Sequence, residues 1–236
     1  MKIRVQKILA DRGVCSRREA EKLIAAGKVF VNKKIVQIGE KADPQKDEIV
    51  VEAAALEKKA AEKIVVAMWK PTGFVTSTKK TAFEKKNIFD LLPRDFPRVF
   101  PVGRLDKDSS GLLILTNDGK IAFELTHPKF FHEKIYEVLL TKPVSNADLE
   151  KIRRGEIFLF GKKIRPAPVK KLGGARVEIR LSEGKNRQIR RIFRTLGSGV
   201  KKLRRVGIGK LFLKDLKIKE GEFRILKKDE IQKLFR

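Results

Sequence analysis

Apolar positions near the start of the chain recur at helical spacing and predict two short helices. Residues 4–12 form the first, with one apolar stripe made of Val5, Ile8 and Leu9. The second begins after Ser16, because a serine followed three residues later by Glu19 has the pattern of a capping box. The stretch "KVFVNKKIV" then predicts two short strands joined by a turn at Asn32 and Lys33.

The pattern changes after residue 52. The stretch "AAALEKKAAEK" has the composition of an exposed helical spacer, whereas "IVVAMW" directly after it is a run typical of a buried strand. We therefore expect two domains and a linker, over residues 1–52, 53–63 (the linker) and 64–236.

The second domain mixes strands and helices without a regular alternation. We expect strands near 64–69, 111–116, 134–140, 157–160 and 175–181, and helices near 119–126, 145–154, 187–196 and 228–235. Because the order is irregular, an α+β fold with a largely antiparallel sheet is favoured over a doubly wound parallel sheet.

Charge narrows the classes of partner. Lys and Arg number 56 against 29 Asp and Glu, which gives a formal net charge of +27. A polyanion would relieve the self-repulsion of such a chain. Membrane insertion is disfavoured, because no apolar run approaches the roughly 20 residues of a spanning helix.

Candidate metal and redox chemistry is sparse. The N-terminus lacks the apolar region of a signal peptide, and the single Cys15 cannot form an intrachain disulfide. His127 and His132 have no metal-ligand spacing with other residues. We expect a protein of the reducing cytoplasm that binds no metal.

One acidic residue has an unusual place. In "GRLDKDSSGLLILTNDG", Asp106 lies between Arg104 and Lys107 in a loop that leads into an apolar strand. Such a loop is a rigid mount for an exposed functional side chain, although a plain salt bridge has the same appearance. On spacing alone, Asp108 serves equally well as the functional acid.

Basic and aromatic residues form two further patterns. In "EGKNRQIRRIFRTLG", arginines repeat at helical spacing opposite an apolar stripe, which suits either a solvated face or phosphate binding. In "HEKIYEVLL", Lys134 and Tyr136, the only tyrosine of the chain, lie on one face of a predicted strand. A lone tyrosine is more often packing, but it also suits stacking on an extruded base.

These segments resemble known families. Residues 2–52, with "SRREAEKLI" and "AGKVFVNKKIV", resemble the S4-type RNA-binding module. The segments "KPTGFVTS", "RVFPVGRLDKDSSGLLILTNDG", "HEKIYEV" and "EGKNRQIRRIF", in this order, resemble the RsuA/RluB-type pseudouridine synthases that modify ribosomal RNA.

The resemblance implies isomerisation of a uridine in ribosomal RNA without a cofactor. It implies that Asp106 is the catalytic aspartate, that Arg104 helps to order it, that Tyr136 stacks on the target base and that Arg190 pairs with the aspartate. With the basic patterns it implies RNA contacts from Arg17, Arg18, Lys22, Arg104, Lys134, Arg187 and Arg191.

The partner is then ribosomal RNA or a ribosome assembly intermediate, bound by a monomer. Whether the carboxylate attacks the base or acts at the sugar stays open. Two other classes of function are compatible with the composition. One is an RNA-binding assembly factor whose synthase domain is inactive, and the other is a DNA- or membrane-binding protein in which Asp106 is structural. Neither a DNA-reading helix motif nor a membrane-surface helix is recognisable in the sequence.

Overall fold

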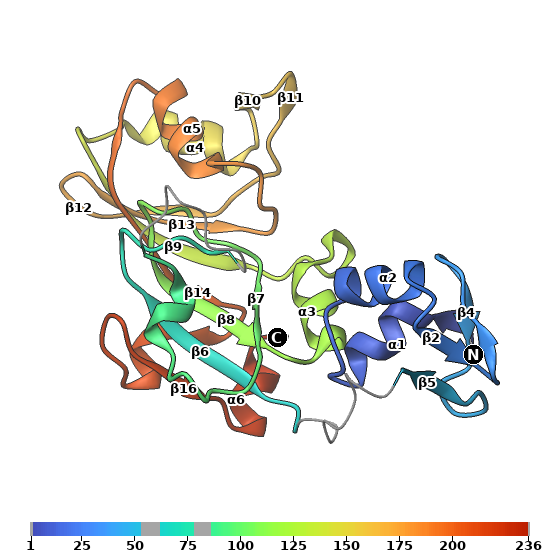
Figure 1. The fold of residues 1–236 in the computed structure, drawn as a ribbon. Coiled ribbons are helices and arrows are strands. Elements are labelled where there is room, and N and C mark those ends of the chain that lie inside the picture. The colour runs from blue at the N-terminus through green and yellow to red at the C-terminus, as the bar shows by residue number, and fades with distance from the viewer. Residues whose placement is uncertain (1, 53–61, 78–85, 236) are drawn as a thin grey trace. The chain divides into compact units, whose positions relative to one another are not determined.

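The computed structural model describes residues 2–52, 62–77 and 86–235 (Figure 1). The chain divides into two compact units, one made of residues 1–63 with 117–119 and the other of residues 64–116 with 120–236. Most of the linker expected at 53–63 lies outside the described residues.

The first unit is small and contains both predicted helices. Ser16 caps the second helix, because its side chain accepts a hydrogen bond from the backbone N–H of Glu19 at 3.1 Å. The chain order is β1 (Ile3–Arg4), α1 (Val5–Asp11), α2 (Arg17–Ala25), β2 (Val29–Val31), β3 (Lys34–Ile35), β4 (Lys41–Ala42) and β5 (Ile49–Val51).

The turn predicted between β2 and β3 is confirmed. Asn32 and Lys33 both have positive φ, 51° and 67°, which matches the right-handed twist of a two-residue hairpin. The two helices pack on the strands around a common core that includes Val5, Ile8, Leu9, Ala20, Ile24, Val29 and Val51.

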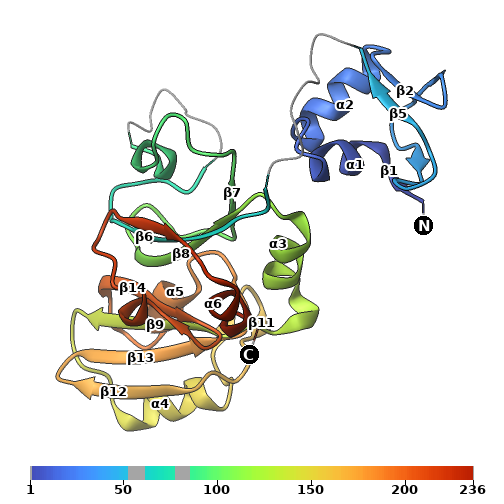
Figure 2. The same cartoon turned by 90° about the horizontal axis from the view of Figure 1, so that it is seen from below.

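The second unit is built on a mixed sheet in the order β12-β13-β9-β14-β8-β6-β16, with β15 beside β14 and β7 beside β8 (Figure 2). Neighbouring strands are antiparallel except β14 and β8. The strands are β6 (Val65–Lys70), β7 (Phe100–Val102), β8 (Ser110–Thr116), β9 (Lys134–Leu140), β12 (Val169–Gly173), β13 (Arg176–Leu181), β14 (Val200–Ile208), β15 (Leu211–Phe212) and β16 (Phe223–Ile225).

Helices and a hairpin complete this unit. A separate two-stranded sheet is formed by β10 (Phe158–Leu159) and β11 (Lys162–Lys163). The α-helices are α3 (Gly119–Thr126), α4 (Asn146–Arg153), α5 (Gln188–Thr195) and α6 (Lys228–Lys233), and the 3-10 helices are η2 (Ile88–Leu91), η3 (Pro128–Phe130) and η4 (Leu213–Leu216).

The strand β8 is buried on both faces, which explains its unbroken apolar run. Leu112 and Ile114 belong to one hydrophobic cluster, together with residues of α3 and η4. Leu113 and Leu115 point the other way, into a cluster that contains Ile88 and residues of β6. A strand covered on both sides gives a fixed support for the loop that precedes it.

The structure confirms the α+β class and the predicted helices, but it adds strands that the pattern did not indicate. The most central is β14, for which the basic stretch "VKKLRRVGI" gives no clear strand pattern. The inward positions of this strand are Leu203, Arg205 and Gly207. Because one of them is a buried arginine, the alternation of apolar and polar residues that marks a strand is not visible in the sequence.

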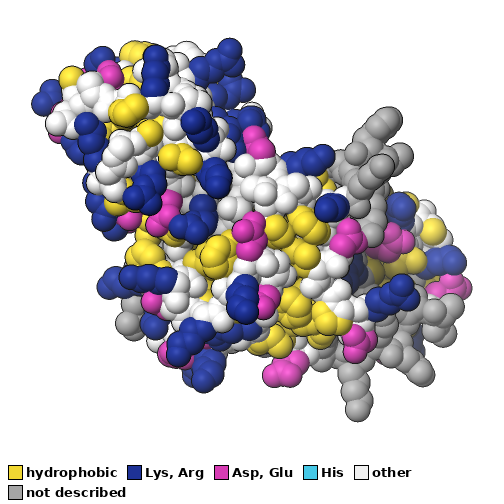
Figure 3. Space-filling view, turned by 90° about the vertical axis from the view of Figure 1, so that its left-hand side faces the viewer, with side chains coloured by type: hydrophobic (Ala, Val, Ile, Leu, Met, Phe, Trp, Pro, Cys, Tyr) yellow, Lys and Arg dark blue, Asp and Glu magenta, His cyan; other side chains and the backbone are white. Residues whose placement is uncertain are grey.

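Basic side chains dominate the part of the surface seen in Figure 3. Lys and Arg, drawn in dark blue, outnumber Asp and Glu on that face, as the net charge of +27 leads one to expect. Among the described residues, no helix has the length and apolar content needed to cross a bilayer.

The junction of β8 and β14 predicts a strict requirement for glycine. Gly111 has φ +112°, and a Cβ placed there would lie 2.2 Å from the Arg205 backbone oxygen. We expect Gly111→Ala to lower the free energy of unfolding by about 3 kcal/mol in urea titrations, since both strain and overlap are introduced. Gly173→Ala is the matched control, because Gly173 also has positive φ but no atom within 4 Å of a Cβ. Equal losses in both variants would show that the overlap with Arg205 is relieved.

Candidate active site

A buried lysine fixes the loop that carries Asp106. Lys70, at the end of β6, is fully buried, and its Nζ donates to the backbone oxygens of Ser109 at 2.7 Å, Pro71 at 2.9 Å and Asp106 at 3.1 Å. Three acceptors satisfy the three protons of an ammonium group. Burial lowers the pKa of Lys70 to about 8, although the charges of Asp108 and Asp106 oppose that change.

Two further contacts fix the same loop from the segment after β6. The hydroxyl of Thr76 accepts from the Leu105 N–H at 3.3 Å and donates to the Leu105 carbonyl at 2.9 Å. The N–H of Gly73 donates to the Lys107 carbonyl at 2.7 Å. Because the backbone on both sides of Asp106 is held, the carboxylate has a defined origin while its head stays 35% exposed.

The two acids of the loop meet Arg187, which precedes α5 as its N-cap, and Arg190 within α5. Arg187 donates to both carboxylate oxygens of Asp108, at 3.2 and 2.9 Å, and its Nη1 lies 3.6 Å from Oδ2 of Asp106. Arg190 lies 3.2 Å from Oδ2 of Asp108 and donates to the Asp108 carbonyl at 2.9 Å. Two carboxylates and two guanidinium groups therefore form one cluster.

The pairing differs from the one that the resemblance implies. Arg190 was expected to pair with Asp106, but among the described residues the guanidinium beside Asp106 belongs to Arg187. Arg190 holds Asp108 instead, and it also donates to the Val200 carbonyl at 3.0 Å. Arg190 thus connects α5, the loop and β14, which suits a positioning role.

The charges of the cluster shift the pKa values of Asp108 and Arg187. Partial burial raises the pKa of Asp108, but the hydrogen bonds from Arg187 and the charges of Arg190 and Arg187 outweigh it, so that the pKa lies below its ordinary value. The hydrogen bonds to Asp108 raise the pKa of Arg187. The ion pair between Arg187 and Asp108 is consequently fully charged at neutral pH.

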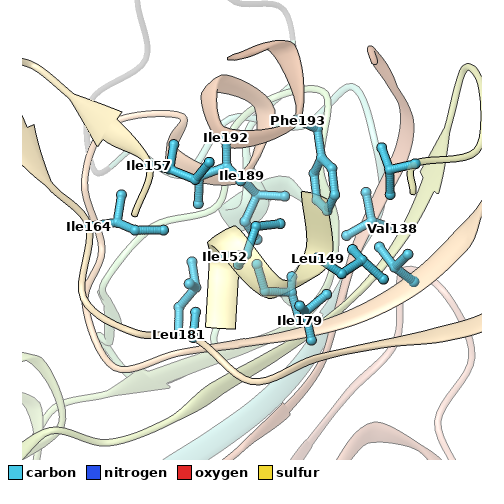
Figure 4. Close-up of a cluster of buried hydrophobic side chains, with 14 of the residues drawn as sticks. Val138, Leu149, Ile152, Ile157, Ile164, Ile179, Leu181, Ile189, Ile192 and Phe193 are labelled. Atoms are coloured by element: carbon cyan, nitrogen blue, oxygen red, sulfur yellow. The ribbon is translucent and has the colours of Figure 1, made fainter. Parts of the chain in front are cut away.

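The arginines of α5 are oriented by burial of the opposite face of this helix. Ile189, Ile192 and Phe193 point into a cluster with Leu149 and Ile152 of α4 (Figure 4). This confirms the apolar stripe predicted for the helix. Since that face is locked in the core, the arginines must face outward from the cluster.

Tyr136 and Lys134 lie on β9, as predicted. Tyr136 is half-buried and packs against the hydrophobic cluster that contains Leu105, the residue before Asp106. In the sheet register Tyr136 is opposite Arg205 of β14, which in turn is opposite Gly111 of β8. Strands lie roughly 4.8 Å apart, so about 10 Å separates the backbones of Tyr136 and Gly111.

The half-buried Lys134 and the buried Arg205 are the basic residues next to this tyrosine. Burial, with a smaller effect of the Arg205 charge, lowers the pKa of Lys134 to about 8. Arg205 is 2% exposed and its Nε donates to the Leu112 carbonyl at 2.6 Å. Within the described residues, its Nη2 has no hydrogen-bond partner.

The other predicted site residues lie at the surface. Arg104 is exposed, and in the described part of the chain no hydrogen bond or ion pair holds its side chain. Arg191 is also exposed. The three residues of α2 that are predicted to contact RNA are all exposed, and Lys22 lies 4.0 Å from Glu19; they are Arg17, Arg18 and Lys22.

Sequence reasoning missed the residues that support the site from within. The sequence patterns assign no role to Lys70, Thr76 or Arg205. The signal for Lys70 was a lysine that ends an otherwise apolar strand. No group of three or more His, Cys, Asp or Glu side chains suited to a metal ion occurs among the described residues, which are 2–52, 62–77 and 86–235.

Comparison with known proteins identifies the class. A model of the RNA pseudouridylate synthase family matches residues 64–195, and an S4 domain model matches residues 3–49. The chain therefore belongs to the RNA pseudouridine synthases and carries an N-terminal S4 domain. The predicted fold and enzyme class are both confirmed by these matches.

Individual relatives cover nearly the whole chain. The dual-specificity RNA pseudouridine synthase RluF of Escherichia coli (strain K12) is 37% identical over 99% of this chain and 79% of its own length. Ribosomal large subunit pseudouridine synthase B of Bacillus subtilis (strain 168) is 37% identical over 98% of this chain and 95% of its own. A pseudouridylate synthase crystal structure matches with a TM-score of 0.73, 33% identity and coverage of 98% of this chain and 99% of that one.

Loss of the Lys70 ammonium group should loosen the loop. We expect Lys70→Met to lower the free energy of unfolding by about 3 kcal/mol, because three carbonyls lose a charged donor. Urea titrations measure this loss. The exposed Lys171→Met on β12 is the control, with an expected change within about 0.5 kcal/mol.

The difference in stability between the parent protein and Lys70→Met should depend on pH. The pKa of Lys70 is about 8 in the folded chain, whereas an unperturbed lysine has a pKa of 10.5. Between these values the unfolded chain binds more protons, so the stability of the parent protein relative to the variant rises as the pH rises from 8 to 10.5. A stability difference that stays flat or shrinks across this range would contradict the buried position of Lys70.

Proposed function

We propose that this protein converts a specific uridine of ribosomal RNA to pseudouridine, with the carboxylate of Asp106 as the catalytic group. The observation that carries the proposal is the Asp106 loop. Its backbone is held by Lys70, Thr76 and Gly73, while the carboxylate is 35% exposed beside Arg187. A half-exposed acid on a backbone held this tightly is what a substrate-facing carboxylate requires.

Ribosomal RNA is favoured as the substrate by the relatives and by charge. One relative with 95% of its length covered is named a ribosomal large subunit pseudouridine synthase. The net charge of +27 suits a large polyanion. We propose that the protein acts in the cytoplasm as a monomer, without a cofactor, on ribosomal RNA or on a ribosome assembly intermediate.

The reaction needs no external reactant. The N1–C1′ bond of the uridine breaks, a C5–C1′ bond forms, the proton on C5 is released and N1 gains a proton. A carboxylate serves this sequence in either of two ways: it adds to an electrophilic carbon and leaves again, or it removes a proton from the ribose. Both routes require the Asp106 carboxylate to be ionised and held in place.

The neighbouring residues take distinct roles. The target nucleotide must leave its stack, at a cost of a few kcal/mol, to reach Asp106. Tyr136 offsets this cost by stacking on the uracil, and Lys134 and Arg191 contact the RNA backbone. Arg187 orients Asp106, whereas Arg190 acts through Asp108 as a positioning residue.

We further propose that the S4 domain adds affinity and not chemistry. Arg17, Arg18 and Lys22 make an exposed basic face on α2 and contact RNA phosphates. Arg104 extends phosphate binding next to the Asp106 loop. The domains proposed for these roles are residues 1–52 and 64–236, joined by the linker.

Replacing the carboxylate should stop the reaction without preventing binding. We expect Asp106→Asn to reduce tritium release from ribosomal RNA labelled at uridine C5 by about 1,000-fold or more, while the affinity for RNA changes less than threefold. An amide keeps the shape of the side chain but neither adds to carbon nor accepts the ribose proton.

Asp108→Asn serves as the control in the same assay. Asp108 faces two arginines and has no assigned chemical step, so we expect at least a tenth of the parent rate. A normal rate for Asp106→Asn would refute its catalytic role. If the parent protein itself binds ribosomal RNA but releases no tritium, the protein is an RNA-binding assembly factor instead.

The S4 domain should be visible in the salt dependence of binding. Replacing Arg17, Arg18 and Lys22 together by Gln should weaken RNA binding and flatten the slope of log affinity against log salt by about 0.7 per lost phosphate contact on single strands. The charge-matched control replaces the exposed Lys217, Lys219 and Lys228 by Gln. The same flattening in both triple variants would mean that net charge, and not the α2 face, is responsible.

A further inference from the structure

One cavity of the second unit is lined in part by Arg187, Arg190 and Arg191 of the mechanism above, and in part by residues to which that mechanism gives no role. It is open to solvent on one side and has a volume of about 540 Å³, which is within the range of roughly 300–1,000 Å³ found for small-molecule sites. Its lining combines the β10–β11 hairpin with the basic face of α5 and contains no acid: Phe158, Leu159, Phe160, Arg187, Arg190, Arg191, Arg194 and Thr195.

The arginines that line this cavity divide into two pairs. Arg187 and Arg190 are bound to the acids of the loop. Arg191 instead places its guanidinium 4.5 Å from the ring centre of Phe160 and donates from Nε to the Asn186 carbonyl at 3.2 Å. The side chain of Arg194 is exposed and has no hydrogen bond or ion pair among the described residues. Neither of these two arginines pairs with a carboxylate in the described part of the chain, so this half of the arginine stripe can take an anion from outside.

Phe160 has an unusual backbone for a large residue. It has φ +55° in the two-residue turn between β10 and β11, beside Gly161 at φ +72°. Asn or Gly takes this position easily, whereas a bulky side chain there is strained. The ring is also 62% exposed, so neither turn geometry nor core packing accounts for a phenylalanine.

We propose that this cavity is a second nucleotide subsite, which takes an unpaired nucleotide of the RNA next to the target uridine. The base stacks on Phe160, with Arg191 at the same ring, and the phosphate is bound by Arg194. Arg187 lines the cavity and lies 3.6 Å from Asp106, so one guanidinium joins this subsite to the reacting position. Stacking on an aromatic ring beside arginines is the usual chemistry of single-strand binding.

The proposed subsite rests on the proposed function, because it takes RNA as the substrate. The subsite would also affect which uridine is selected. A duplex offers no free base face to Phe160, so the subsite favours a uridine that lies beside an unpaired residue. An acidic peptide would also pair with the arginines, but it has no base to stack on the ring of Phe160. A test that compares ligands with and without bases therefore distinguishes RNA from an acidic peptide.

The test measures base-dependent binding without turnover. Two fluorescently labelled RNA hexamers are compared, oligoadenylate and a hexamer of abasic nucleotides with the same number of phosphates. We expect the parent protein to bind the adenylate about 10-fold more tightly. Phe160→Asn should reduce this preference at least about fivefold, since stacking contributes roughly that much per base or more.

Phe131→Asn is the matched control. Phe131 also has positive φ, at 50°, is 52% exposed and has the Arg165 guanidinium 4.5 Å from its ring centre, but it is not part of the cavity. It should leave the preference unchanged. Asn suits the turn at 160, and a urea titration checks that the variant is folded.

A second variant tests the phosphate contact. Arg194→Gln should weaken binding of both hexamers by the same factor and leave the preference for adenine intact. The proposal is overturned if Phe160→Asn keeps the parent preference, if Phe131→Asn reduces it equally, if Arg194→Gln changes neither affinity, or if hexaglutamate competes as well as the adenylate. Because the hexamers contain no uridine, this binding test does not depend on isomerisation, which separates its failure from a failure of the proposed function.

Discussion

The site depends on a single buried ammonium group. Lys70 donates to the backbone oxygens of Asp106 and Ser109, and so fixes the start and the end of the turn that presents the acid. A buried cation is costly unless all its protons are bound, and here three carbonyls bind them. The carboxylates of Asp106 and Asp108 lower that cost further, since their charges favour the protonated amine. The acid and its support therefore stabilise each other.

A second constraint comes from α5. Phe193 and Ile192 bury the apolar side of this helix in the core, so its arginines lie on the opposite side, away from the core. Part of the stripe neutralises the acids of the loop, and the rest lines the cavity by the β10–β11 hairpin. In the proposed function, this one helix serves two neighbouring positions along a bound strand of RNA, and the spacing of its arginines sets the distance between them.

The central sheet brings segments that are remote in sequence side by side. Tyr136, Arg205 and Gly111 come from three strands that are neighbours only in the folded chain, one of them in parallel pairing. Gly111 allows the Arg205 backbone to approach within a distance that excludes any side chain. The arginine, buried in this way, lies between the loop strand and the tyrosine strand.

Local patterns were sufficient for much of this description. The capping serine, the Asn32–Lys33 turn, the apolar stripe of α5 and the Asp106 loop before a buried strand all follow from residues close in sequence, because each depends on short-range geometry. The partners of the acids did not follow. Whether Asp106 meets Arg187 or Arg190 depends on how α5 lies against the loop, about 80 positions away. Lys70, Thr76 and Arg205 are ordinary polar residues until the fold buries them, and only then do their hydrogen bonds have to be made within the protein.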